Sequence, residues 1–303
     1  MTPATSSGAS PAGTLGIDVG GTTIKGIRVS ADGRVLAEHR APTPKPDPTG
    51  ERVADAVAEV VSALGGSGGD PVGVVVPGIV DELTGVAVRS ANVGFRDAPM
   101  RLLLEQRLGT PVAFGQDVRA GAVAEQRSGA GRGLAGGVAF VAVGTGVAAA
   151  FLVDGRTVVS GGWAGEIGQL VIGAGPFAGR RMEEVASASA TALRAGEPDA
   201  RAVALRVATG DADAAAVWAD TVGVLAESLG AIVAILAPET VILGGGLGQA
   251  GDLLLDPLRA ELERRLADMR VPRLVPAEHG DIAAALGAAI LAEDARAAAE
   301  VVA

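Results

Sequence analysis

Glycine and threonine combine in two turns that follow apolar segments in distant parts of the chain. The first turn reads DVGGTT from Asp18 to Thr23, and the second reads GTG from Gly144 to Gly146. Consecutive glycines let backbone N–H groups point toward an anion, and a threonine hydroxyl adds a donor. Either turn could equally be an ordinary tight hairpin, because a lone GTG is a weak signal. The pair favours two phosphate-binding turns, made by Gly20, Gly21, Thr22, Thr23, Gly144, Thr145 and Gly146.

Two aspartates stand where predicted strands end. Asp18 is a candidate ligand for Mg²⁺, directly or through a water molecule, because this ion prefers carboxylate oxygens. Asp117 lies between a predicted strand and a predicted helix, where its carboxylate could accept a proton from a substrate hydroxyl during phosphoryl transfer. The commoner role for aspartate at such a position is to cap the helix. A catalytic role therefore requires that capping leaves one carboxylate oxygen to the substrate.

Polar side chains suited to sugar hydroxyls are spread along the chain. Sugars need short, directional hydrogen-bond partners, which carboxylates and amides supply. The candidates are Asn92, Gln116, Glu166, Gln169 and Glu183, together with Gly78 in the turn after an apolar strand. Each could instead be an exposed loop residue, and only clustering in space would make them ligands.

A third glycine-rich turn, Gly244-Gly245-Gly246, follows the apolar run Thr240–Leu243. Backbone without side chains can approach a flat ligand closely, so this turn is a candidate for contact with an adenosine. A flexible loop is the alternative interpretation, and the turn alone does not decide between them.

The elements that must position these residues include a repeated pattern. Residues 15–36 read LGIDVGGTTIKGIRVSADGRVL, and residues 138–159 read VAFVAVGTGVAAAFLVDGRTVV. Both contain an apolar strand, a Gly-Thr turn, a second strand, an Asp-Gly-Arg turn and the start of a third strand. Asp-Gly between apolar runs is a strong hairpin signal. We predict that the chain uses one β-meander twice, although glycine-rich hairpins can also resemble each other by chance.

The rest of the chain alternates between helix and strand, which predicts an α/β fold. Helices are predicted at residues 50–64, 99–108, 117–128, 182–195, 211–236, 256–268 and 282–299, and strands at 72–76, 111–114 and 240–243. Two meanders imply two lobes with a cleft between them. We expect a disordered tail at residues 1–13, a small lobe at 14–116 and a larger lobe at 117–281. The C-terminal helix, at about 282–300, should pack back on the small lobe.

Composition excludes several classes of function. The chain has 25 Lys and Arg against 35 Asp and Glu, and this acidic balance argues against a nucleic-acid partner. It has no cysteine, which excludes disulfides and thiolate nucleophiles. The N-terminus lacks a secretory signal, and glycines in the uncharged stretch Gly133–Val153 favour two strands over a membrane helix. We therefore expect a cytoplasmic protein without membrane association.

Four segments taken together resemble the ROK family, which includes bacterial glucokinases and repressors. The segments IDVGGTTIKG, QDVRAGAVAE, GTGV followed by GGWAGEIGQ, and VILGGG occur in family order, from about Leu15 to Ala292. The resemblance implies a two-lobed, actin-like (ribonuclease H-like) sugar-kinase fold. It also implies a sugar between the lobes, MgATP across the phosphate turns, and Asp117 as general base toward a hexose hydroxyl, the 6-OH. Family members often form dimers, so a homodimer is expected by analogy.

The same resemblance assigns sugar contacts to Asn92, Glu166 and Glu183, but the sequence departs from the family pattern at several positions. Gln116 and Arg119 stand where the family has asparagine. The family's zinc site needs one histidine and three cysteines, whereas the histidine position is Gln169 and the loop Gly173–Arg181 is short and free of cysteine. We predict ATP and Mg²⁺ as cofactors and no zinc. Gln169 can hydrogen-bond a hydroxyl but cannot act as a base.

These departures leave other functions open. The phosphoryl donor could be polyphosphate, and the acceptor could be another hexose or an N-acylhexosamine. The chain could also be a pseudokinase or regulator that binds sugar or nucleotide without turnover, because Gln116 and Arg119 alter the surroundings of Asp117. A DNA-binding repressor is not expected, since only about fourteen residues precede the first turn, too few for a helix-turn-helix domain.

Overall fold

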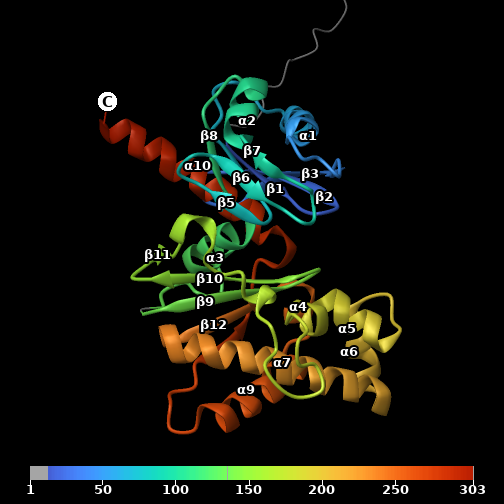
Figure 1. Cartoon of the computed structure of the whole chain (residues 1–303). Helices are drawn as coiled ribbons and strands as arrows, with labels where there is room; N and C mark the ends of the chain where they lie inside the picture. Colours follow the sequence, from blue (N-terminus) through green and yellow to red (C-terminus); the bar gives the residue numbers. More distant parts are fainter. Residues whose placement is uncertain (1–12, 135, 303) are drawn as a thin grey trace, which may run out of the picture. The chain divides into compact units, whose positions relative to one another are not determined.

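The computed structural model describes residues 13–134 and 136–302. The chain forms two compact units (Figure 1). The first extends to Ala120 and includes the C-terminal segment from Ala284, and the second comprises Gly121–Ala283. The tail expected at residues 1–13 lies, except for Gly13, outside the described residues.

The first unit is built on a five-stranded sheet with strand order β3-β2-β1-β4-β8. Its strands are β1 (Thr14–Val19), β2 (Thr23–Val29), β3 (Val35–Pro42), β4 (Val72–Val76) and β8 (Val112–Gln116). Strands β1, β2 and β3 pair antiparallel as a meander, and β4 and β8 run parallel to β1. All residues of β4 are buried, as expected for a parallel strand covered on both faces.

Helices cover both faces of this sheet. Helices α1 (Glu51–Ala63) and α2 (Met100–Leu108) pack on the face formed by Leu15, Ile17 and their neighbours. The other face meets α10 (Ala283–Val302) at two strand glycines. A methyl group on Gly16 would lie 2.0 Å from the Ala285 oxygen, and one on Gly73 would lie 1.8 Å from the Ala288 oxygen. Only glycine therefore lets this alanine-rich helix lie so close to the strands.

A small antiparallel sheet with strand order β5-β6-β7 was not predicted from the sequence. Its strands are β5 (Ile79–Asp81), β6 (Val86–Arg89) and β7 (Arg96–Ala98). It begins directly after Gly78, which has a φ of +100°. A methyl group on Gly78 would lie 2.2 Å from the Arg89 oxygen, so the chain can turn into this sheet only with glycine at that position.

The second unit repeats the strand order of the first, as β11-β10-β9-β12-β13. Its strands are β9 (Val138–Val143), β10 (Val147–Val153), β11 (Arg156–Thr157), β12 (Thr240–Gly244) and β13 (Arg273–Pro276). Strands β9 to β11 pair antiparallel, and β12 and β13 run parallel to β9. The repeated β-meander predicted from the sequence is confirmed, and the stretch from Gly133 to Val153 contains two strands rather than a helix.

The remaining helices belong mostly to the second unit. They are α3 (Asp117–Ser128), in which the boundary at residue 120 falls, α4 (Glu183–Ala186), α5 (Ala188–Ala195), α6 (Ala200–Ala208), α7 (Ala212–Leu236), α8 (Gly245–Gly248) and α9 (Asp252–Leu266). Short 3₁₀ turns are η1 (Ser160–Gly162), η2 (Ile167–Gln169) and η3 (Gly280–Ile282). Helices α7 and α9 lie together beneath the sheet in Figure 1 and share one apolar core with it.

Helix α7 is, among the described residues, the one helix long and apolar enough to cross a membrane. Half of its most apolar window is buried in the protein. Trp218, Leu225 and Leu229 of this helix are almost fully buried in the core under β9 and β12. A core helix enclosed in this way needs the same apolar composition.

Several helix boundaries differ from the sequence-based expectation. The single helix predicted at residues 182–195 is wrong, because Ser187 is extended and separates α4 from α5. The Ser187 hydroxyl accepts a hydrogen bond from the Ala190 N–H at 3.0 Å and thereby caps α5. The glycines after β12 begin the short helix α8 rather than a loop. Helix α6 and strand β13 were not predicted.

Helix α9 begins at Asp252 rather than at the predicted Asp256, so Pro257 lies inside it. Proline has no N–H, and the carbonyl of Leu253, four residues earlier, loses its usual helical donor. The Trp218 Nε1–H of α7 donates to this carbonyl at 3.1 Å. An indole from a neighbouring helix therefore replaces the backbone hydrogen bond that proline removes.

We predict that Trp218→Phe lowers the free energy of unfolding by ~1–3 kcal/mol, since it leaves the Leu253 carbonyl without its donor. Urea denaturation of the full chain measures this loss. Pro257→Ala supplies a backbone N–H to the same carbonyl, so it should recover part of the loss in the Trp218→Phe background. Strictly additive losses in the double variant would contradict this explanation.

Candidate functional site

In the first unit, the candidate residues gather at one edge of the sheet. Strands β1, β4 and β8 are parallel, and their register pairs Asp18 with Val75 and Val75 with Gly115. The DVGGTT turn, Gly78 and Asp117 each follow the carboxyl end of one of these strands. Adjacent strands are about 4.8 Å apart, so Asp18 and Gly115 are separated by roughly 10 Å. A small molecule at this edge could contact all three segments.

The DVGGTT turn is held by its own backbone and by Thr43. The Gly20 N–H donates to the Thr23 oxygen at 3.0 Å, which closes the hairpin. The Thr43 N–H donates to the Thr22 oxygen at 3.0 Å, and the Thr43 hydroxyl donates to the Gly20 oxygen at 2.7 Å. These three hydrogen bonds therefore hold the backbone of the turn in place through protein groups.

Asn92 lies directly beside this turn. A methyl group on Gly21 would lie 3.0 Å from the Asn92 Cβ, so the absence of a side chain at Gly21 makes room for the asparagine. Asn92 is exposed, and the Oδ1 atom of Asp18 is buried at the strand end. The structure thus brings a candidate sugar ligand next to a candidate phosphate turn.

Asp117 is half-buried at the first residue of α3. Its Oδ1 atom accepts hydrogen bonds from the Val118 N–H at 2.8 Å and from Gln116 Nε2 at 2.8 Å. The Gln116 Oε1 atom in turn accepts from the Arg119 N–H at 2.8 Å. Gln116, the residue before α3, therefore caps the helix through Oε1 and holds the Asp117 carboxylate through Nε2, so the capping role that the sequence favoured for Asp117 belongs to Gln116.

Arg119 links the start of α3 to residues that follow β4. Its guanidinium is almost fully buried, donates to Glu82 Oε1 at 2.8 Å and donates to the Val80 oxygen at 3.1 Å. The same Glu82 oxygen accepts from the Gln116 N–H at 3.2 Å. Gln116 and Arg119, which replace asparagines of the family pattern, are thus tied to each other and to the strand ends. Sequence reasoning missed Glu82, because no local pattern marks its contact with residues 34 to 37 positions away.

In the second unit, two glycine turns meet at the corresponding sheet edge. The Gly144 N–H donates to the Gly146 oxygen at 2.9 Å, and the Gly144 oxygen accepts from the Ala188 N–H at 2.9 Å. Gly245 has a φ of +75°, and a methyl group there would lie 2.4 Å from the Val143 oxygen. The glycine-rich turn after β12 therefore packs against the end of β9, from which the GTG turn begins.

The GEIGQ segment runs along β10 beside the GTG turn. Gly165 accepts a hydrogen bond from the Ala149 N–H at 2.8 Å, and its φ of +101° suits glycine. Glu166 is half-buried and Gln169 is exposed. A methyl group on either Gly146 or Gly168 would lie 2.9 Å from Glu183 Oε2. Glu183 thus lies between the GTG turn and the GEIGQ segment.

The acidic side chains that the structure describes do not cluster into a metal site. Within residues 13–134 and 136–302, no group of three or more His, Asp or Glu side chains could hold a metal ion. Gln169 Nε2 donates instead to Glu183 Oε1 at 2.7 Å, and Gln169 Oε1 accepts from Arg181 Nη1 at 3.0 Å. Sequence reasoning did not select Arg181 as a site residue. Its spacing from Glu184 marks only a local ion pair at i and i+3, and no sequence signal marks its contact with Gln169.

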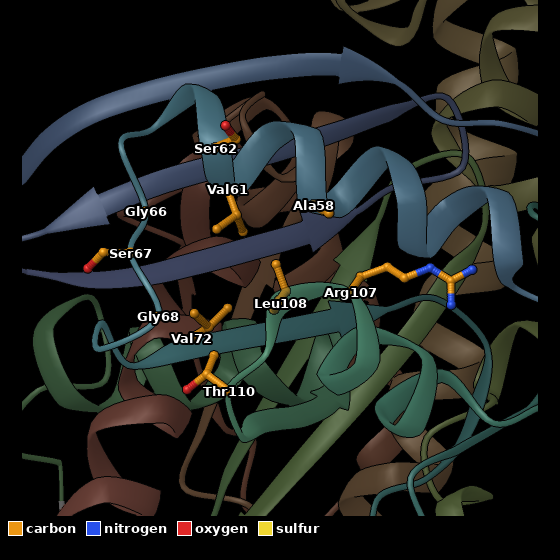
Figure 2. Close-up of a pocket in the computed structure, with 10 residues that line it drawn as sticks. All are labelled: Ala58, Val61, Ser62, Gly66, Ser67, Gly68, Val72, Arg107, Leu108 and Thr110. Carbon is orange, nitrogen blue, oxygen red and sulfur yellow. The ribbon is translucent and has the colours of Figure 1, made fainter.

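A separate pocket of about 160 Å³ lies in the first unit between the C-terminal halves of α1 and α2. Figure 2 shows Ser62, Ser67, Leu108 and Thr110 around it, while the Arg107 side chain extends along α1. Arg107 forms ion pairs with two acids of that helix. None of the candidate residues lines this pocket, so it is not part of the candidate site.

Comparison with known proteins identifies the family. The ROK family model matches residues 14–295. The glucokinase of Streptomyces coelicolor is 31% identical, over 93% of this chain and 98% of its own. A ROK family glucokinase from Streptomyces griseus, solved with glucose and AMPPNP, superposes with a TM-score of 0.80 at 27% identity and covers 93% of this chain and 99% of its own.

A third similar protein is an inorganic polyphosphate/ATP-glucomannokinase from Arthrobacter sp. strain KM. It is 35% identical with a TM-score of 0.72, and the match covers 93% of this chain and 98% of that one. The family match extends over nearly the whole length of the chain. The chain belongs to the ROK family.

Proposed function

We propose that this protein is a carbohydrate kinase that transfers the γ-phosphoryl group of ATP to a hexose hydroxyl, the 6-OH. One observation carries the proposal: the DVGGTT turn, Asn92 and Asp117 lie at the same edge of one sheet. Such an edge offers a phosphate site, a sugar ligand and a base within reach of one substrate. The glucokinases similar to this chain support the reaction and the substrate class.

The nucleotide is proposed to bind at the three glycine turns. Backbone N–H groups of residues 20–23 and 144–146 would hold the phosphates, and the turn at Gly244–Gly246 would lie against the adenosine. The fit is favourable at Gly144 and Gly246, where a methyl group would meet no other atom within 4 Å, so the backbone there is open to a ligand. Asp18, with a buried carboxylate oxygen at the strand end, suits Mg²⁺, directly or through water. Bound Mg²⁺ supplies charge neutralisation of the phosphates.

Asp117 is proposed to take the proton from the attacking hydroxyl. The hydrogen bonds from Val118 and Gln116 to its Oδ1 fix the carboxylate plane, so little reorientation is needed when the hydroxyl arrives. Asn92, Glu166, Gln169, Glu183 and the Gly78 turn are proposed to bind the sugar, whereas Gln116 is buried, bonds at both ends of its amide to Asp117 and Arg119, and is proposed to position Asp117 instead. Carboxylates accept hydrogen bonds from hydroxyls, while the amides can donate or accept.

A second candidate concerns the donor and the sugar. The relative with 35% identity uses inorganic polyphosphate as well as ATP and is a glucomannokinase. Polyphosphate and mannose are therefore proper alternatives to ATP and glucose for this chain. The formal charge of −10 weakly disfavours a long polyanion, so ATP remains the leading donor. A cytoplasmic location, a homodimer and the absence of a nucleic-acid partner stay part of the proposal by analogy.

We predict that Asp117→Asn lowers kcat by ~10²–10⁴-fold, the usual contribution of a general base, because asparagine cannot accept the hydroxyl proton. The measurement is a coupled ADP-release assay with glucose, mannose, fructose and N-acetylmannosamine. Asp268→Asn, at an exposed position of the second unit, is the control and should keep wild-type kcat. Retention of kcat within a few-fold in Asp117→Asn would refute the assigned role. Turnover by none of these sugars, with ATP in this assay or with polyphosphate when the sugar phosphate itself is measured, would favour a non-catalytic binding protein.

We also predict that the purified protein contains no stoichiometric zinc. Both ends of the Gln169 amide are used on Arg181 and Glu183 Oε1, and the chain has no cysteine to complete a zinc site. Elemental analysis should find well under one zinc per chain, and turnover should require Mg²⁺ but survive a zinc-selective chelator. One equivalent of zinc, or inactivation by that chelator, would overturn the prediction.

A further inference from the structure

Gln169, Arg181, Glu183 and Glu184 form a connected network in the second unit. Arg181 Nη1 donates to Gln169 Oε1 at 3.0 Å, and Gln169 Nε2 donates to Glu183 Oε1 at 2.7 Å. The same guanidinium donates to Glu184 Oε1 through Nε at 3.0 Å and Nη2 at 2.8 Å. Its Nη1 also lies 3.7 Å from Glu183 Oε1. One arginine thus contacts an amide and two carboxylates.

The backbone around Arg181 is fixed by a short two-stranded ladder. Val171 and Arg181 pair as an antiparallel bridge, and the Met182 N–H donates to the Leu170 oxygen at 2.8 Å. At the far end of this loop, Phe177 lies against the Arg194 guanidinium, 4.7 Å from ring centroid to Cζ. The loop is therefore closed by protein groups alone, and it presents the Arg181 guanidinium at a defined place.

The chemistry of the partners decides which way the Gln169 amide points. A guanidinium can only donate hydrogen bonds, and a carboxylate can only accept them. With Arg181 on one side and Glu183 on the other, the Gln169 oxygen must face the arginine and its NH₂ group must face the acid. The reverse orientation would lose both hydrogen bonds. Arg181 therefore removes the rotational ambiguity that an exposed glutamine otherwise has.

The hydrogen bond from Gln169 also determines which oxygen of Glu183 remains available to a ligand. Oε1 is engaged by Gln169, whereas Oε2 lies against Gly146 and Gly168 and accepts no hydrogen bond from the residues that the structure describes. The hydrogen bond with Glu184 raises the pKa of Arg181, and the hydrogen bond with Arg181 lowers the pKa of Glu184. Both groups therefore stay charged at neutral pH, and the ion pair between them is retained there.

We propose that Arg181 is a positioning residue for sugar recognition: it locks Gln169 and Glu183 so that Glu183 Oε2 is presented as the acceptor for one sugar hydroxyl. The inference rests on the proposed function, because it assumes that Glu183 binds the sugar. It assigns Arg181 to the specificity of the site and not to the chemical step.

The test compares Arg181→Met with Arg181→Lys and with the control Arg180→Met. Arg180 is the neighbouring cation, and its Nη2 contacts only the backbone oxygen of Glu184. We expect Arg181→Met to raise the hexose KM by about 10–100-fold, the usual effect of removing a hydrogen bond to a charged group. The KM for ATP and kcat at saturating hexose should change less than threefold. Lysine keeps the charge but not the planar fork, so Arg181→Lys should give an intermediate KM.

A series of monodeoxy sugars makes the test specific. If Arg181 acts through Glu183 on one hydroxyl, the sugar that lacks this hydroxyl should have nearly the same KM with wild type and with Arg181→Met. For the other deoxy sugars, the KM of Arg181→Met should exceed that of wild type by the same factor as for the unmodified sugar. The proposal would be overturned if the ratio of the Arg181→Met KM to the wild-type KM were the same for every sugar. It would also be overturned if Arg180→Met raised the hexose KM equally, or if Arg181→Met lowered kcat without changing the KM. A melting temperature of Arg181→Met near that of wild type excludes general unfolding as the cause.

Failure of the proposed function remains distinguishable from failure of this inference. If wild type turns over no sugar with any donor, the kinase assignment fails, and glucose binding by isothermal titration calorimetry replaces KM as the readout. The same pattern is expected there: a Kd increase of about 10–100-fold in Arg181→Met and little change in Arg180→Met. Equal Kd values for wild type and Arg181→Met would reject the role of Arg181.

Discussion

The parallel pairing of three strands in each unit is the constraint on which the rest of the structure depends. In β1, β4 and β8, and again in β9, β12 and β13, parallel register brings the carboxyl ends of segments far apart in sequence to one edge. Except at β13, the chain leaves each of these strands through a glycine-containing turn or a helix N-terminus. Every candidate residue for phosphate or base chemistry stands at such an exit, and its position follows from the strand register.

Much of this could be read from the sequence because its signals are local. The two meanders, the buried strand Val72–Val76 and helix α3 follow from apolar runs and Asp-Gly turns, which act over a few residues. The break at Ser187 was missed because alanine-rich residues on both sides favour one continuous helix. The small sheet β5-β6-β7 was missed because its strands have only three or four residues each.

The arrangement within the candidate site was harder to predict because it depends on long-range contacts. Asp117 could be selected from its place between strand and helix, but its support by Glu82 and Arg119 joins residues that no sequence pattern links. That the chain has no cysteine for a zinc site was visible in its composition. The contacts of Gln169 with Arg181 and Glu183 could not be predicted in this way. They depend on side-chain geometry that composition does not encode.

The close approach of α10 to Gly16 and Gly73 has a consequence for biosynthesis. The helix that covers this face of the first sheet follows the whole second unit in the chain. During translation the N-terminal sheet therefore emerges from the ribosome with one apolar face open, and it stays so until residues 284–303 have been made. Since domains tend to fold as they emerge, the second unit can mature first, and the N-terminal unit is the one exposed to chaperones and to aggregation in the nascent chain.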